Sequence, residues 1–385
     1  MRILIAPDSF KESLSALQVS KAIKSGFSKV FPQASYDLLP LGDGGEGTVE
    51  SLAHVLKLTP QLTEVTGAFG ELTQVTYALR DDMAVFEMAD IVGLEKIPMG
   101  KRNPLNVRTH GVGELILHLI ERGVKHILIG IGGSASHDGG IGMAAGLGVQ
   151  FFDEDGKIVE AIGSSIGRIT NFSTALLSPS LKGVQIELIT DVDNPLCGPN
   201  GATFVFAGQK GLPLSDFDKV DSAMQSLYEL INPDIIEHAG AGAGGGMAAG
   251  LVHFAGAEIR KGIDFVLDKL NFDEKVKKAD LVIVGEGRMD RQSLAGKTPI
   301  GVARRTPKNI PIIAICGSLA NDLPAFPIET IRAAFPIIAE IRDVQETLAR
   351  AEENISRTAE QVARIVQLAK EVDNGPVQTD ELLVL

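Results

Sequence analysis

The chain has 385 residues, 44% of them hydrophobic and 22% charged, which is typical of a globular protein of one or two domains. Its net charge of −13 argues against a nucleic acid or an anionic membrane as the partner, because phosphate-binding surfaces are usually basic. No run approaches the ~18 apolar residues of a membrane helix, and the first apolar run is too short for a signal peptide. With two cysteines in no metal or redox spacing, we expect a cytoplasmic protein.

Several segments repeat one pattern, in which a short β-branched run is followed by a turn of glycine or acidic residues and then by a helical period. The strands predicted from this pattern are 2–6, 127–131, 281–285 and 312–316. Continuous apolar strands that alternate with helices predict one parallel sheet containing all four, with helices on both faces. Ligands of such sheets bind beyond the carboxyl ends of the strands.

Helix boundaries are also visible in the sequence. Ser15 with Gln18 three residues later is typical of a capping box at a helix start. Gly123 is placed to end a helix as a C-terminal cap. An amphipathic helix is expected over 344–372, followed by a loose tail over 373–385.

Two stretches break the alternation of strand and helix. Alternating polar and apolar residues over about 62–88 predict antiparallel hairpins. Three strand-like pieces with little helix between them follow, at 149–152, 186–189 and 202–206.

These stretches predict an α/β protein in which a second domain interrupts the first. The Rossmann-like domain with the parallel sheet is expected to comprise residues 1–60, 107–147 and 239–385. The inserted, discontinuous α/β domain is expected to comprise 61–106 and 148–238.

The segment Gly130-Ile131-Gly132-Gly133-Ser134-Ala135 allows three interpretations. It fits G-x-G-x-x-A after a strand, and Asp153 lies at about the distance of a ribose-binding acid, which indicates a dinucleotide-dependent dehydrogenase. Alternatively, the amides of Gly132, Gly133 and Ser134 cradle a phosphate at a helix N-terminus. The third interpretation is a simple tight turn between elements.

Two further glycine motifs carry weaker signals. Gly296-Lys297-Thr298 imitates the end of a Walker A loop, but Arg291 occupies the position of its first glycine. Lys297 therefore either contacts a phosphate as a point charge or is solvated. The sequence Gly-Met-Ala-Ala-Gly-Leu occurs at both 142–147 and 246–251, which predicts two helix starts with small residues that allow close packing.

Carboxylates are concentrated in glycine turns after predicted strands. They are Asp8, Asp43, Glu46, Asp138, Asp191, Asp193, Glu286 and Asp290. Such groups can hold Mg²⁺ or accept a proton from a hydroxyl, although each one alone is more often a helix N-cap.

Taken together, the motifs closely resemble those of the bacterial type I glycerate kinases, over nearly the whole length. The resemblance is carried by the segments at 5–15, 43–48, 113–116, 130–135, 138–140, 191–196, 208–211, 240–246 and 285–290. The chain departs from the family pattern at Ser136-His137, where a threonine–asparagine pair is expected. The resemblance implies ATP-dependent phosphorylation of glycerate with Mg²⁺, yielding 2-phosphoglycerate, by a Rossmann-like domain with a second domain inserted.

Roles within the site are hypotheses that combine this resemblance with side-chain chemistry. The expected catalytic residues are Asp8, Lys11 and Asp191. The expected contacts to the substrate are Ser9, Arg108 and Arg288. The expected contacts to ATP are Gly132, Gly133, Ser134, Gly242, Gly244, Gly245 and Lys297. The expected Mg²⁺ ligands are Asp43, Asp193 and Glu286.

Two rivals from other classes stay open: the dehydrogenase, and a two-lobed metabolite-binding protein without catalysis. We expect the small molecule glycerate as the partner, and neither a nucleic acid nor a membrane. Homo-oligomer formation is left open by the sequence.

Overall fold

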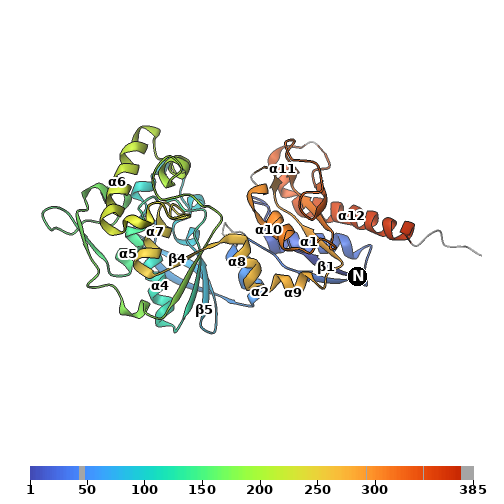
Figure 1. The fold of residues 1–385 in the computed structure, drawn as a ribbon, viewed down its shortest axis with the longest axis horizontal. Coiled ribbons are helices and arrows are strands. Elements are labelled where there is room, and N and C mark those ends of the chain that lie inside the picture. Colours follow the sequence, from blue (N-terminus) through green and yellow to red (C-terminus); the bar gives the residue numbers. More distant parts are fainter. Residues whose placement is uncertain (43–47, 292, 341, 374–385) are drawn as a thin grey trace, which may run out of the picture. The chain divides into compact units, whose positions relative to one another are not determined.

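The computed structural model describes residues 1–42, 48–291, 293–340 and 342–373, and the chain forms two compact units. Unit 1 comprises Met1–Leu41 and Leu267–Leu385, and unit 2 comprises Gly42–Val266 (Figure 1). The α/β class and the insertion of one part into another are confirmed. The boundaries differ from the prediction, because the inserted unit is one continuous segment and the discontinuous unit is the one that carries both ends of the chain.

Unit 1 is built on a parallel sheet of five strands in the order β15-β13-β11-β1-β2. Their bounds are β1 Arg2–Ile5, β2 Ser35–Leu38, β11 Leu281–Val284, β13 Ile312–Cys316 and β15 Ile331–Pro336. All four residues of β11 are buried, as expected for a strand covered on both faces. The short strands β12 (Arg288–Met289) and β14 (Ser318–Leu319) continue this parallel arrangement beyond the sheet.

Helices α1 and α12 of unit 1 lie side by side (Figure 1). The helices of this unit are α1 Ala16–Ser28, α9 Phe272–Val276, α10 Thr298–Arg305, α11 Val344–Ala349 and α12 Ala351–Asp373, and α8 (Gly262–Lys269) spans the boundary of the units. The predicted capping box of Ser15 and Gln18 is confirmed at the start of α1. Gly26 lets the two helices approach, since a Cβ there would lie 2.2 Å from the carbonyl oxygen of Ser356.

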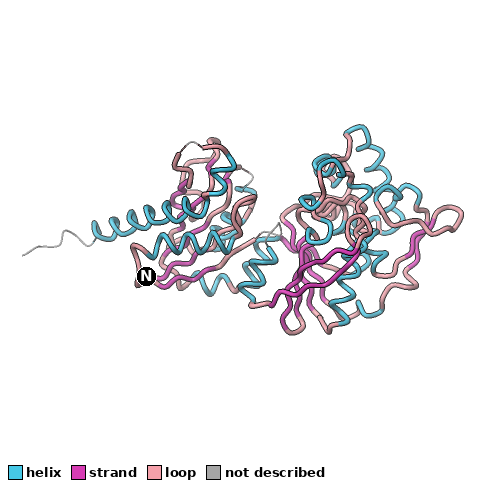
Figure 2. The backbone as a smooth tube through the Cα atoms, turned by 180° about the vertical axis from the view of Figure 1, so that it is seen from behind, coloured by secondary structure: helices cyan, strands magenta, loops and turns pink. Residues whose placement is uncertain are grey.

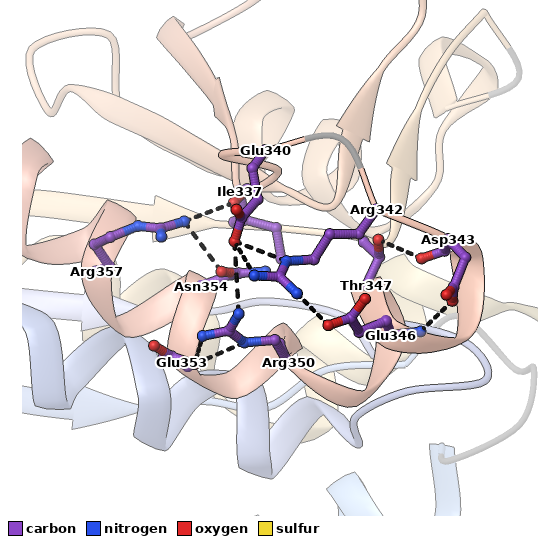
Figure 3. A network of polar contacts seen from close by, with 10 residues as sticks. All are labelled: Ile337, Glu340, Arg342, Asp343, Glu346, Thr347, Arg350, Glu353, Asn354 and Arg357. Atoms are coloured by element: carbon purple, nitrogen blue, oxygen red, sulfur yellow. Dashed lines mark hydrogen bonds and ion pairs between the residues drawn. The ribbon is translucent and has the colours of Figure 1, made fainter.

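A network of ion pairs fixes the chain between β15 and α12 (Figure 3). Asp343 caps α11 by accepting the amide of Glu346 at 2.8 Å, and Arg342 pairs with both Glu340 and Glu346. Arg350 ends α11, so the single helix predicted over this region is two helices. Because these charges are largely solvated, each pair contributes little stability, and their joint effect is to define the turn.

Unit 2 contains a mixed sheet, whose strands are drawn in magenta in Figure 2. Its six strands lie in the order β10-β9-β6-β5-β4-β3. Their bounds are β3 Thr59–Thr66, β4 Leu72–Arg80, β5 Met83–Glu87, β6 His126–Gly130, β9 Gln185–Thr190 and β10 Glu258–Lys261. Strands β5, β6, β9 and β10 run parallel, whereas β3, β4 and β5 form the predicted antiparallel hairpins. The hairpin prediction is therefore confirmed.

Two sequence predictions for strands were wrong. Strand β6 belongs to the sheet of unit 2, whereas β1, β11 and β13 form the sheet of unit 1. An apolar run predicts that a strand is buried, but it does not specify which partner strand it pairs with. The piece at 202–206 is also not a strand, because Thr203–Ala207 forms a short π-helix, η6.

The helices of unit 2 cover this sheet and the loops beyond it. They are α2 Thr48–Leu56, α3 Ala89–Val92, α4 His110–Glu121, α5 Ile141–Gly146, α6 Phe217–Ile231 and α7 Met247–Ala255. A separate hairpin is formed by β7 Gln150–Phe152 and β8 Asn171–Ser173. Gly123 follows α4 with φ of 88°, which confirms its predicted capping position.

Short 3₁₀ turns connect these elements. They are η1 Leu94–Lys96, η2 Met99–Lys101, η3 Pro104–Asn106, η4 Gly163–Arg168, η5 Pro179–Leu181, η7 Gly208–Lys210, η8 Leu214–Asp216, η9 Pro233–Ile235 and, in unit 1, η10 Ser293–Ala295. In the part of the chain that the structure describes, no helix combines the length and apolarity that crossing a membrane requires.

The repeated Gly-Met-Ala-Ala-Gly segments pack against each other through α5 and α7. Gly140 and Gly246 precede the two helices in left-handed conformations. A Cβ at Gly140 would lie 3.0 Å from the Cα of Gly250. The predicted helix starts and close packing are therefore confirmed.

Candidate active site

In unit 1, the carboxyl ends of three neighbouring strands are tied together by backbone hydrogen bonds. The amide of Asp8, after β1, donates to the carbonyl of Gly285, after β11, at 2.8 Å. The amide of Gly317, after β13, donates to the carbonyl of Glu286 at 3.0 Å. Residues that follow β1, β11 and β13 therefore share one edge of the sheet, where ligands of parallel sheets bind.

Asp8 is held at this edge through both of its carboxylate oxygens. Its Oδ1 accepts the amide of Ser9 at 2.6 Å. Its Oδ2 accepts the hydroxyl of Thr298, the first residue of α10, also at 2.6 Å. Two short donors fix the direction of the carboxylate, which is the geometry required of a group that orients a substrate hydroxyl.

Glu286 follows β11 at the same edge of the sheet. The side chain is 6% exposed, and its Oε1 has no hydrogen-bond partner among the described residues. Burial raises the pKa of Glu286 to about 8; Asp8 and Asp290 add to the rise, while Ser293 and Lys297 oppose it. Burial therefore disfavours the ionised form of this carboxyl.

The other residues predicted for this part of the site are more exposed. Lys11 lies in the turn after Phe10, and Arg288 extends into solvent beside Asp290, with 3.8 Å between Nε and Oδ2. Lys297 occupies the N-cap position of α10. These cations lie near the strand ends in sequence and are accessible to an anionic ligand.

In unit 2, the glycine run before α7 lies against the loops that follow β6 and β9. The amide of Gly242 donates to the carbonyl of Asn194 at 3.1 Å. A Cβ at Gly245 would lie 2.3 Å from the carbonyl oxygen of Ser136, and one at Gly244 would lie 3.6 Å from that of Ile131. The run therefore needs glycine for close approach, and it leads into a helix of nine residues.

The phosphate cradle predicted after β6 included a helix N-terminus, and this part of the prediction is wrong. No helix begins there, because α5 starts only at Ile141. The carbonyl of Gly133 accepts the amide of Leu94 at 2.8 Å, and the buried hydroxyl of Ser134 accepts from Lys210 at 3.0 Å. Gly132 and Gly133 lie in a turn, as the third interpretation of this motif predicted.

The dinucleotide interpretation fails for a related reason. Asp153 follows β7, which pairs with β8 and not with β6. Its Oδ1 accepts the amides of Asp155 and Lys157 at 3.1 and 2.9 Å, so the side chain organises a tight turn. Without a helix after the glycine motif and an acid on the adjacent strand, the elements of a dinucleotide site are missing from these described segments.

A buried lysine that the sequence did not single out supports the loop after β6. Lys210 is 4% exposed, and its Nζ donates to the carbonyl of Ser136 at 2.8 Å and to the hydroxyl of Ser134. Burial lowers the pKa of Lys210 to about 8, and Asp138 opposes the shift. A lysine flanked by glycines in Gly208-Gln209-Lys210-Gly211 was the available signal, but nothing local indicated its burial.

Asp138 is fully buried at the start of the segment that leads to α5. It accepts the hydroxyl of Thr109 at 2.5 Å and the amides of Gly140 and Gly142 at 2.9 and 3.2 Å. Burial raises the pKa of Asp138, and these hydrogen bonds oppose the rise. This acid therefore has a structural role in shaping the glycine-rich turn.

His137 is also fully buried, and it is not a candidate proton carrier near neutral pH. Burial, with a smaller effect from Lys210, lowers the pKa of His137 to about 3. Its Nε2 lies 3.0 Å from the hydroxyl of Thr203. The histidine at the position that departs from the family pattern is thus a neutral packing residue.

The remaining predicted residues are scattered. Asp191 and Asp193 follow β9 and are exposed, and Asp193 pairs with Lys261 at 3.2 Å. Arg108 forms an ion pair with Glu160, which already balances its charge. Asp43 and Glu46 lie outside the described residues.

Of the three predicted metal ligands, Asp193 and Glu286 are described by the structure, and Asp43 is not. Among the described residues, no group of three or more His, Cys, Asp or Glu side chains is arranged to hold a metal ion. Asp193 belongs to unit 2 and Glu286 to unit 1.

Comparison with known proteins gives consistent results over nearly the whole chain. The glycerate kinase family matches residues 3–367. A glycerate kinase of Neisseria meningitidis serogroup B is 50% identical over 370 residues, covering 96% of this chain and 100% of the relative. A glycerate 2-kinase of Escherichia coli K12 is 41% identical over 370 residues, covering 94% and 97%.

A solved structure shows the same fold. A crystal structure from Salmonella typhimurium LT2, described as glycerate kinase 2, superposes with a TM-score of 0.85 at 40% identity and covers 96% of this chain and 99% of that one. Because the match extends through the motifs of both units, the resemblance noted in the sequence is confirmed: the chain belongs to the glycerate kinase family.

Proposed function

We propose that this protein transfers the γ-phosphoryl group of ATP to the 2-hydroxyl of glycerate, producing 2-phosphoglycerate and ADP. The observation that carries the proposal is the family match over residues 3–367, supported by the relative named glycerate 2-kinase. In this reaction the hydroxyl oxygen forms a bond to the γ-phosphorus, the bond from that phosphorus to the bridging oxygen breaks, and ADP leaves. The hydroxyl proton passes to a carboxylate.

The residues of unit 1 support the proton and charge requirements of this step. Asp8 has a carboxylate fixed by two donors at a strand end, which suits it to orient the hydroxyl and accept its proton. Lys11 and Lys297 are cations that can offset charge on the phosphoryl oxygens, and Ser9 and Arg288 are candidates for the substrate carboxylate.

The residues of unit 2 supply a second set of candidate contacts. Gly242, Gly244 and Gly245 precede α7, and a helix start favours phosphate binding; the amides of Gly242 and Gly245 would have to exchange their present acceptors, the carbonyls of Asn194 and Gly242, for a phosphate. Asp191 follows β9 and is our second candidate for a catalytic acid. Arg108 stays a weaker candidate for the substrate, since it would have to exchange Glu160 for glycerate.

Mg²⁺ is part of the proposal as the complex with ATP. Protein sites for Mg²⁺ often use one or two carboxylates together with substrate phosphates, so a three-residue cage is not required. The ion would neutralise charge on the phosphates. Two free, buried cysteines, Cys197 and Cys316, accord with the proposed cytoplasmic location.

The test measures ADP release with glycerate, ATP and Mg²⁺ present, and with each omitted in turn. The proposal requires ADP release that depends on all three. An enolase-coupled assay then identifies the product, because enolase acts directly on 2-phosphoglycerate. Signal without added mutase supports the 2-hydroxyl as acceptor, whereas dependence on mutase identifies the 3-hydroxyl. Glycerate binding without turnover would favour the binding-protein alternative.

A further inference from the structure

The triplet Gly296-Lys297-Thr298 imitates a nucleotide-binding motif, yet its threonine is used for something else. The side chain of Thr298 is fully buried. Its hydroxyl donates a 2.6 Å hydrogen bond to Oδ2 of Asp8, which lies 290 residues away in the sequence. Because its side chain is buried and its hydroxyl is bonded to Asp8, Thr298 is not exposed to a nucleotide.

The hydrogen bond joins the start of a helix to the end of a strand. Thr298 begins α10, where Pro299 fits the first turn and Lys297 accepts the amides of Ile300 and Gly301 at 3.0 and 2.9 Å. Strand β1 ends shortly before Asp8, whose amide bonds to the residue after β11. The position of the hydroxyl is therefore set by two rigid elements of unit 1.

The other oxygen of Asp8 is held from within its own segment by the amide of Ser9 at 2.6 Å. A donor on one oxygen alone restrains the carboxylate less than donors on both oxygens do. Two donors, one on each oxygen, define both its direction and its tilt. Short hydrogen bonds to a carboxylate are stronger than neutral ones, so the orientation is firmly held.

We propose that Thr298 is a positioning residue that fixes the carboxylate of Asp8 for phosphoryl transfer. The inference rests on the proposed function, in which Asp8 orients the acceptor hydroxyl. It predicts that the threonine acts on the chemical step through Asp8 and has little effect on substrate binding. Small misplacements of a catalytic group can reduce rates by ~10²-fold.

The experiment replaces Thr298 by valine, which keeps the shape and removes the donor. We expect kcat of Thr298→Val to fall about 10- to 100-fold, while KM for ATP and for glycerate changes only a few-fold. Thr298→Ser restores the hydroxyl and should recover most of the rate. If the valine variant does not fold, comparison of Thr298→Ser with Thr298→Ala isolates the hydroxyl, because both lack the methyl group.

Thr306→Val is the matched control. Thr306 follows the same helix, is 4% exposed, and donates its hydroxyl to the carbonyl of Val302 at 2.7 Å. Loss of the Thr306 hydroxyl removes a buried hydrogen bond from α10 and leaves the hydrogen bonds of Asp8 intact. We expect a lower melting temperature with kcat unchanged, which separates a general loss of stability from loss of positioning.

A double-mutant cycle with Asp8→Asn completes the test. If Thr298 acts through Asp8, the double variant should be hardly slower than Asp8→Asn alone. If the kcat losses of the two single variants multiply in the double variant, the inference is overturned. Wild-type kcat in a folded Thr298→Val protein would also overturn it, and so would a Thr298→Ser variant as slow as Thr298→Val. Full activity of Asp8→Asn would overturn it while leaving the proposed function intact. Wild-type protein without glycerate-dependent turnover would overturn both.

Discussion

The Nζ atom of Lys210 donates a 2.8 Å hydrogen bond to the carbonyl oxygen of Ser136, although the two residues are 74 positions apart. This contact places a cation beneath the loop that follows β6, close enough to Asp138 and His137 for electrostatic coupling. A buried amine with two acceptors is costly to remove, because its partners are left without a donor.

Lys210→Met should destabilise the protein by ~1–3 kcal/mol near pH 7.5, since methionine keeps an unbranched side chain but lacks the amine that donates the hydrogen bonds. The pH dependence gives a sharper test. The pKa of Lys210 is lowered to about 8, so between pH 8 and about 10.5 the unfolded chain binds more protons at this residue than the folded chain. Wild-type stability should therefore rise with pH in this window relative to Lys210→Met, by at most ~1.4 kcal/mol per pH unit. Parallel curves from urea unfolding of the two proteins would contradict the burial of a titrating amine.

Glu286→Gln tests the raised pKa of the buried acid in unit 1. Because the folded pKa of Glu286 is about 8, its contribution to stability is present below the unfolded value near 4.5 and is lost as pH rises through 8. The glutamine variant does not titrate, so its stability relative to wild type should increase between pH 5 and 8. Denaturant titrations at several pH values measure the difference, and a constant difference would show that Glu286 is ionised throughout.

Gly245→Ala tests the close approach of the glycine run to the loop after β6. Gly245 has φ of 72°, and a Cβ there would lie 2.3 Å from the carbonyl oxygen of Ser136. We expect a loss of ~1–2 kcal/mol from the left-handed backbone and a further ~1–3 kcal/mol from the overlap. Gly256→Ala is the matched control, because φ there is 64° and no atom lies within 4 Å of the new Cβ. Equal losses in the two variants, measured by thermal unfolding, would show that the loop shifts without cost.

Asp191→Asn should lower kcat by ~10²–10⁴-fold if this acid takes part in the reaction, since a positioned acid or base contributes about that much. The substitution keeps the size of an exposed side chain, so the melting temperature should hardly change. Asp153→Asn is the control. The asparagine keeps an Oδ1 atom that can accept the amides of Asp155 and Lys157, and the carboxylate of Asp153 matters to activity only in the dinucleotide hypothesis. Normal turnover in Asp191→Asn would remove this residue from the site, and selective loss in Asp153→Asn would revive the rival.

Local patterns predicted the features that depend on neighbours in sequence. The capping box at Ser15 needs only Gln18, and the cap at Gly123 needs only the end of its own helix. The hairpins of β3, β4 and β5 follow from alternating polarity over adjacent segments. The glycine and acidic motifs, in their order along the chain, were sufficient for the family.

Tertiary structure decided which strands pair and which charged groups are buried. An apolar run such as Ile127–Ile129 is equally suited to either sheet, and only its pairing with β5 and β9 assigned it to unit 2. Lys210 and Glu286 acquire their altered pKa values from burial by segments distant in sequence, and Asp8 acquires its second donor from Thr298. Sequence periodicity reports contacts over one or two turns of chain, whereas desolvation and strand pairing depend on every segment that packs around a residue.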